Sequence, residues 1–170
     1  MNDLLQPAPP GQHWFVLHAR PRCEKKVAVY VGLQGAPAFL PLRRRAHRYG
    51  ARLRTFTSPL FTGYLFACGD AVLQARLRQN RHVARLLEVP DQATLLGQLG
   101  QIRMALELGD LVEVLPYLEV GRRVRVSQGP LRGLEGIVQK VRDRTRMVIN
   151  LDIIRESVAV EIDSTLLDPA

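Results

Sequence analysis

The sequence predicts an α+β fold: a sandwich of helices against a mostly antiparallel sheet, followed by a small all-β barrel. Three observations lead to this class. Strand and helix patterns alternate as far as residue 108, only short strand patterns follow it, and 170 residues with 46% hydrophobic side chains suffice for two small domains. We therefore expect a flexible leader at 1–11, one domain at 12–112, a linker at 113–119 and a second domain at 120–170.

The leader is expected because the Pro-Ala-Pro-Pro-Gly run at 7–11 suits neither a helix nor a central strand. After it, strand formers cluster in short runs, and helices are marked by apolar residues every three or four positions and by caps such as Asp70. The elements expected in the first domain are strands at 13–18, 38–42, 60–67 and 82–89, a hairpin arm at 43–57 with its tip at Tyr49-Gly50, a helix from Pro21 towards Gly35, a helix at 71–79, and a helical stripe from Leu95 that ends at Gly109.

The pattern changes after Leu108. Short strand patterns are separated by turn residues there, with no helical stripe among them. The expected strands are Arg122–Val126, Leu134–Val141, Met147–Leu151 and Val158–Ile162. A barrel of about 50 residues buries only about 60% of its unfolded surface, so we expect a thin margin of stability.

The charge of the chain points to a polyanionic partner. The 24 basic and 16 acidic residues give a net charge of +8, and 21 of the bases are arginines. Between Lys25 and Gly69 there are eight bases and no carboxylate, so this stretch carries the whole excess. A solvated basic face is the alternative interpretation.

Several functional classes find no support in the sequence. No run of about 18 apolar residues and no secretory signal pattern occurs, so we expect a cytoplasmic chain without membrane contact. Cys23 and Cys68 lack partners at the spacing of a zinc site, and no catalytic motif includes the four histidines. We therefore expect a monomeric binding protein rather than an enzyme, with no catalytic residue, metal or cofactor.

Two parts of the sequence resemble one known family. Three segments are similar to the amino-terminal (NGN) domain of NusG-type transcription elongation factors, namely Trp14–Leu17, Glu24–Val27 and Pro59–Phe66. The segment Val124–Val138, with its Gly-Pro and Gly-x-x-Gly turns, resembles the KOW motif, an SH3-like barrel that follows this domain in the family. The resemblance covers residues 12–168 and implies a factor that rides on elongating RNA polymerase.

The resemblance implies a polymerase-binding surface in the first domain. The positions of His18, Tyr64 and Phe66 contact the clamp helices of polymerase in the family, and Gln74 and Arg76 lie near its gate-loop contact. Alternation along the strand at 60–67 puts Tyr64 and Phe66 on one face, which we expect to be an exposed aromatic docking surface. The alternative is that both side chains belong to the core.

Contacts with nucleic acid are also implied. Arg20, Lys26 and Arg81 lie where relatives face the non-template DNA strand of the transcription bubble, and guanidinium groups both hold phosphates and stack on unpaired bases. The hairpin arm is expected to lie along upstream duplex DNA or polymerase. Its contacts would be made by basic side chains that include Arg43, Arg44, Arg45 and Arg48.

The second domain departs from the pattern of general NusG proteins. Their last barrel loop carries Phe-Gly-Arg, which contacts the termination factor Rho and a ribosomal protein, whereas this chain has Ile154-Arg155-Glu156. The lost aromatic residue indicates a specialised paralogue, similar to RfaH, that counteracts termination in specific operons. The residues expected to bind a partner of this domain, with a ribosomal protein as the candidate, are Leu131, Ile153, Ile154 and Arg155.

Two other functions remain open. A general factor would couple polymerase to Rho or to the ribosome. A separate RNA-binding module would rest on the KOW barrel, although residues 119–170 contain nine bases and eight acids, a balance of only +1.

The state of the second domain matters for access to polymerase. Some specialised relatives refold it as a helical hairpin that masks the polymerase-binding face. Here β-branched strand patterns and the residues Gly129, Pro130 and Gly133 disfavour long helices. We predict a constitutive barrel, which leaves Tyr64 and Phe66 exposed.

Overall fold

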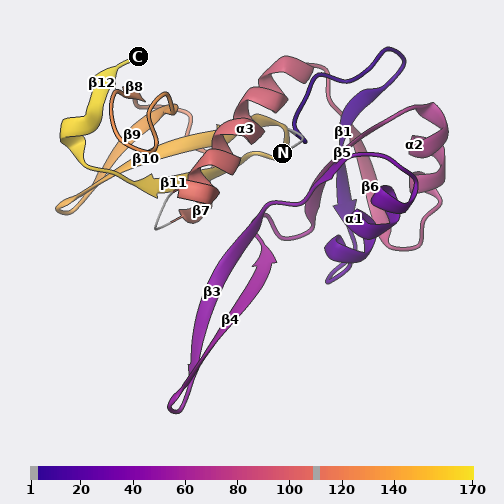
Figure 1. Cartoon of the computed structure of the whole chain (residues 1–170). Helices are drawn as coiled ribbons and strands as arrows, with labels where there is room; N and C mark the ends of the chain where they lie inside the picture. The colour runs from indigo at the N-terminus through magenta and orange to yellow at the C-terminus, as the bar shows by residue number, and fades with distance from the viewer. Residues whose placement is uncertain (1–3, 109–111) are drawn as a thin grey trace. The chain divides into compact units, whose positions relative to one another are not determined.

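The computed structural model of the chain describes residues 4–108 and 112–170 (Figure 1). The chain divides into two compact units, Met1–Ala93 and Thr94–Ala170. The described strands pair antiparallel and are accompanied by three α-helices, which confirms the expected α+β class. Helix α3 (Gln92–Leu108) begins in the first unit and continues into the second, and its predicted stop at Gly109 lies outside the described residues. None of the helices that the structure describes has the length and hydropathy needed to cross a membrane.

The first unit is built on a four-stranded sheet with the order β2-β5-β1-β6. Its strands are β1 (His13–Ala19), β2 (Ala38–Phe39), β5 (Tyr64–Gly69) and β6 (Val83–Glu88). The central pair, β1 and β5, runs from His13 opposite Gly69 to His18 opposite Tyr64. Both ends of β1 therefore lie next to residues far away in the sequence.

Two helices supply the apolar core on one face of this sheet. They are α1 (Glu24–Leu33) and α2 (Ala71–Arg78). Val27 and Val31 of α1 and Leu73 and Leu77 of α2 are buried, and their spacing of four residues is that of one helical face. Helix α2 starts where expected, because the Asp70 carboxylate accepts the Leu73 backbone N–H at 2.8 Å. The sheet residues that join this core are Phe15, Leu17, Ala19, Leu65, Ala67 and Val83.

A long hairpin arm extends from the first unit and forms a sheet of its own (Figure 1). It consists of β3 (Leu42–Tyr49) and β4 (Arg52–Pro59), paired from Leu42 opposite Pro59 to Tyr49 opposite Arg52. Gly50 has a φ of 59° in the connecting turn, a conformation that glycine adopts without a steric penalty. The predicted hairpin and its tip are therefore confirmed.

The strand expected at 60–67 is shorter than predicted. It begins at Tyr64, because the preceding residues form a turn in which the Tyr64 N–H donates to the Phe61 carbonyl at 3.0 Å. Gly63 has a φ of 86° in this turn. Phe61 is therefore outside the strand, and the predicted alternation holds only from Tyr64 onwards.

The second unit contains a six-stranded antiparallel sheet with the order β12-β8-β9-β10-β11-β7. Its strands are β7 (Val112–Pro116), β8 (Arg122–Val126), β9 (Glu135–Val141), β10 (Arg144–Leu151), β11 (Glu156–Glu161) and β12 (Leu167–Pro169). The four predicted strands are confirmed as β8 to β11. A closed barrel is not formed by the described strands, because β12 and β7 remain as two edges of the ladder.

The two outer strands of this sheet were not expected. Strand β7 lies in the segment assigned to the linker and pairs with β11, while β12 has three residues and pairs with β8. Short segments such as these carry little periodicity of their own and are held by partners distant in the sequence. The domain boundary at the linker 113–119 stays a prediction, and strand β7 occupies the first part of that segment.

The segment expected as a flexible leader makes contacts over the part that the structure describes. Leu5 is buried, and the Gln6 carbonyl accepts the indole N–H of Trp14 at 2.8 Å. The Trp14 backbone is held in turn by Gln92, whose side-chain oxygen accepts the Trp14 N–H and whose amide donates to the Trp14 carbonyl, both at 2.7 Å. The residues just before the proline-rich run are thus joined to the start of β1.

Candidate functional site

His18 and Tyr64 form a stacked pair where β1 ends and β5 begins. They lie opposite each other in the ladder, and their ring centroids are 4.8 Å apart with the planes inclined by 14°. Both side chains are half-buried. Stacked rings stabilise each other by about 0.5–1.5 kcal/mol beyond area burial, and partly exposed aromatic residues are frequent anchors of protein interfaces. The pair is therefore a half-exposed aromatic surface that is already ordered in the free chain.

Phe66 lies on the same face of β5 but is not accessible. Its exposed fraction is 0%, and its ladder partner Val16 is also fully buried. The expectation of an exposed surface at Phe66 is therefore wrong, because burying a phenylalanine in a packed face gains about 1.5–3 kcal/mol over leaving it in water. The accessible part of the expected aromatic surface is reduced to Tyr64 and its neighbour His18.

A buried carboxylate holds the turn that precedes Tyr64. Glu24 of α1 is only 5% exposed, and its Oε1 accepts the backbone N–H of Gly63 at 2.9 Å. A Cβ at Gly63 would lie 3.1 Å from the His18 ring, so glycine at this position lets the turn approach the ring closely. This positioning role is invisible in the sequence, where Glu24 has the ordinary pattern of an acidic residue in a first helical turn.

Three exposed bases gather near the same end of β1. Arg20 follows the strand directly, and its backbone N–H donates to the His82 carbonyl at 2.9 Å, which brings it next to Arg81. Lys26 lines a shallow hollow of the first unit together with Asn80 and His82. The predicted DNA-contacting residues thus lie together, although 61 positions separate the first from the last.

The two gate-loop candidates lie on α2. Gln74 is half-buried, whereas Arg76 is exposed and donates from Nη1 to the Gln34 side-chain oxygen at 2.9 Å. Gln34 is the residue at the C-terminal end of α1. This bond ties the ends of the two helices together, so Arg76 also has a structural partner.

The hairpin arm has two unlike faces. Directly opposed residues of an antiparallel ribbon share a face. One face, which we call the aromatic-arginine face, is formed by Arg45, His47, Tyr49, Arg52, Arg54 and Phe56. The opposite face carries Arg44 and Arg48 among aliphatic and threonine side chains. Of the predicted bases, Arg43 lies half-buried at the base of the arm and only Arg45 belongs to the aromatic-arginine face.

The rings of this face are exposed and contact one another. Tyr49 is 58% and Phe56 is 46% exposed. The rings of His47 and Tyr49 are stacked with centroids 4.7 Å apart, and Phe56 meets Tyr49 edge-on at 6.5 Å. Sequence analysis missed these rings, although the alternation on either side of Gly50 was a signal that they share one face with Arg52 and Arg54.

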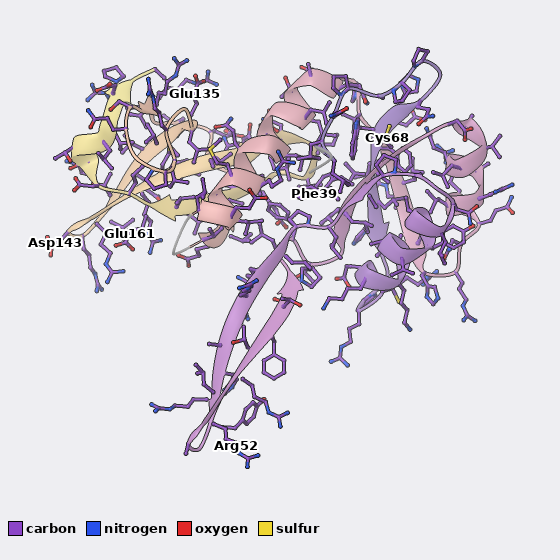
Figure 2. The ribbon with its side chains drawn as sticks, viewed as in Figure 1. Phe39, Arg52, Cys68, Glu135, Asp143 and Glu161 are labelled. Carbon is purple, nitrogen blue, oxygen red and sulfur yellow. The ribbon has the colours of Figure 1, made fainter. Side chains whose placement is uncertain are left out.

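The arginines of the arm have no acidic partner among the residues that the structure describes. Within the described residues, no carboxylate forms an ion pair with an arginine of β3 or β4. Lys25 of α1 instead donates to the Thr57 carbonyl at 3.1 Å and adds another cation at the base of the arm. Figure 2 shows Arg52 near the tip. An uncompensated basic surface of this kind attracts polyanions.

The partner-binding candidates of the second unit lie mostly in one loop. Ile153 and Ile154 are half-buried in a 3-10 turn (Asp152–Ile154), and Arg155 follows with a φ of 56°. The Arg155 guanidinium lies 4.0 Å from the centre of the Tyr117 ring and donates to Glu119 at 2.6 Å. Leu131 is only 7% exposed, so it offers little surface to a partner.

Electrostatic contacts hold this loop together. The hydroxyl of Tyr117 donates to Asp152 Oδ1 at 2.8 Å, and this bond raises the pKa of Tyr117. The hydrogen bond to Glu119 likewise raises the pKa of Arg155. The Arg155 guanidinium is therefore already engaged by Glu119 and by the Tyr117 ring.

Comparison with known proteins places this fold in a family. Residues 12–104 match the family described as NusG, transcription termination factor nusG. The matched stretch is more than half of the chain and contains the His18–Tyr64 pair, the Arg20–Lys26–Arg81 cluster and the hairpin arm. No curated protein matches the chain significantly. The chain belongs to the NusG family of transcription elongation and termination factors.

Proposed function

We propose that this protein is a specialised NusG-family factor that binds RNA polymerase and promotes processive elongation of specific operons. The observation that carries the proposal is the half-exposed His18–Tyr64 stack, at the positions that the family uses for the clamp helices. Its rigid support by Glu24 and Gly63 reduces the conformational entropy lost on docking. Gln74 and Arg76 on α2 are the proposed gate-loop contacts.

A cluster of basic side chains lies close to the proposed polymerase contact. Arg20, Lys26 and Arg81 are exposed and lie near the end of β1 that carries His18. A protein docked through His18 and Tyr64 would therefore hold three cations close to its polymerase contact, where the non-template strand of the bubble is the available polyanion. Their contribution will fall as salt rises, since each phosphate neutralised on a single strand releases roughly 0.7 counterion.

The second unit supports specialisation over a general role. The loop that recruits Rho in general factors has no aromatic tip here, and its Arg155 is held by Tyr117 and Glu119. We propose a KOW-type domain that binds a protein partner, with a ribosomal protein as the candidate, through Ile153, Ile154 and Arg155. The second candidate function, a general factor that couples polymerase to Rho, would appear as Rho-dependent termination stimulated by this protein.

Binding to core RNA polymerase tests the main proposal. Alanine at His18 or Tyr64 should weaken binding of the full chain by about 1–3 kcal/mol if each is an interfacial hot spot. His13→Ala is the matched control, because His13 is an exposed histidine at the other end of the same strand. If the double variant of His18 and Tyr64 remains folded and binds polymerase as tightly as the control, the assignment is wrong.

A further inference from the structure

The aromatic-arginine face of the hairpin arm pairs each ring on one strand with an arginine on the other. Along β3 the order is Arg45, His47, Tyr49, and along β4 it is Arg52, Arg54, Phe56. Same-face residues of a strand are about 6.6–6.8 Å apart, so each ring has a guanidinium within reach of a ligand bound to it. Cations and flat apolar surfaces are thus arranged together on an arm that projects into solvent (Figure 1).

These contacts match the chemistry of unpaired nucleotides. Arginine binds phosphate bidentately, and exposed rings stack on bases, every one of which has a π-face. In duplex DNA the faces of the bases are covered by their neighbours, so a duplex would use the arginines and leave Tyr49 and Phe56 in water. Two large exposed rings beside arginines that no described carboxylate pairs with are therefore better explained by a single strand than by a duplex.

We propose that the aromatic-arginine face binds a single-stranded polynucleotide. Unpaired bases stack on the open sides of Tyr49 and Phe56, while Arg45, Arg52 and Arg54 hold the flanking phosphates. The proposal rests on the proposed function in that it names the nucleic-acid form that the arm takes, and it differs from the duplex or polymerase contact expected from the sequence. DNA and RNA single strands share this chemistry, and the experiment separates them.

The arm contains its own control. Arg44 and Arg48 lie on the opposite face, with Leu53 and threonines around them and no aromatic ring. Removing Arg44 and Arg48 lowers the charge of the arm by the same amount as removing Arg45 and Arg54. A purely electrostatic arm would respond equally to both double substitutions, whereas a binding face responds mainly to the second.

Fluorescence anisotropy with labelled dT12, rU12 and a 12-base-pair duplex tests the proposal on the full chain without polymerase. The double variant Tyr49→Ala/Phe56→Ala should lose roughly 5- to 150-fold in affinity for a single strand for each stacked base, with duplex affinity unchanged. Tyr49→Phe/Phe56→Tyr should retain binding, because it keeps both rings. The ratio of the affinities for dT12 and rU12 then shows whether the arm prefers single-stranded DNA or single-stranded RNA.

Three outcomes would overturn the inference. They are unchanged single-strand affinity in the double alanine variant, an equal loss for single strand and duplex, and equal effects of the two arginine pairs. If the first outcome is accompanied by weaker binding to polymerase, the face is assigned to a protein partner. Polymerase binding is assigned to His18 and Tyr64 and is tested in a separate assay. The proposed function can therefore hold when this inference fails, and this inference can hold when the proposed function fails.

Discussion

Gly63→Ala should damage both the stability of the first unit and the His18–Tyr64 pair proposed to bind polymerase. Gly63 has a φ of 86°, where an L-residue pays about 1–2 kcal/mol. The new methyl group would also lie 3.1 Å from Cδ2 and Nε2 of His18, so the ring must shift by a few tenths of an ångström. That shift acts on the His18–Tyr64 stack, which is worth about 0.5–1.5 kcal/mol. The expected total is about 1.5–3.5 kcal/mol.

Gly35→Ala separates the two contributions. Gly35 has a similar φ of 75°, but a Cβ there would meet nothing within 4 Å. Urea unfolding followed by the fluorescence of the single, buried Trp14 reports on the first unit. Gly35→Ala should cost about 1–2 kcal/mol and leave polymerase binding unchanged, whereas Gly63→Ala should cost more and weaken binding. Equal losses of stability, with equal polymerase affinity, would refute the role assigned to the close approach of Gly63 to His18.

Three further predictions concern other parts of the chain. Glu24→Ala leaves the buried Gly63 N–H without its acceptor and should cost about 1–3 kcal/mol in urea unfolding, with the exposed neighbour Lys26→Ala near zero. Burial raises the pKa of Glu156, so its carboxyl group binds a proton more tightly in the folded state than in the unfolded chain. The stability of the second unit should therefore fall as pH rises from 4.5, the pKa in the unfolded chain, through the raised pKa of the folded state. Glu156→Gln should therefore flatten that pH dependence in thermal unfolding of the second unit, and an unchanged slope would contradict it. Amide chemical shifts of the free full-length protein should show strands across 122–162, and helix there would refute a constitutive β domain.

Local pattern was enough to predict most elements of this protein. Val27 and Val31 mark the inner side of α1, Asp70 caps α2, and Gly50 forms the tip of the arm, all through interactions within a few residues. The alternation that separates Tyr64 from Leu65 is likewise local. The strands β8 to β11 follow for the same reason, because their β-branched runs are bounded by turn residues.

Tertiary structure decided which side chains of those elements are accessible. The burial of Phe66 and the support of Gly63 by Glu24 each depend on residues that lie far apart in the chain. The pairing of β7 with β11, and the edges that leave the sheet open, depend on register between distant segments. Propensity and periodicity act over one or two turns of chain, whereas burial and register are set by packing free energy summed over contacts that only the folded chain brings together.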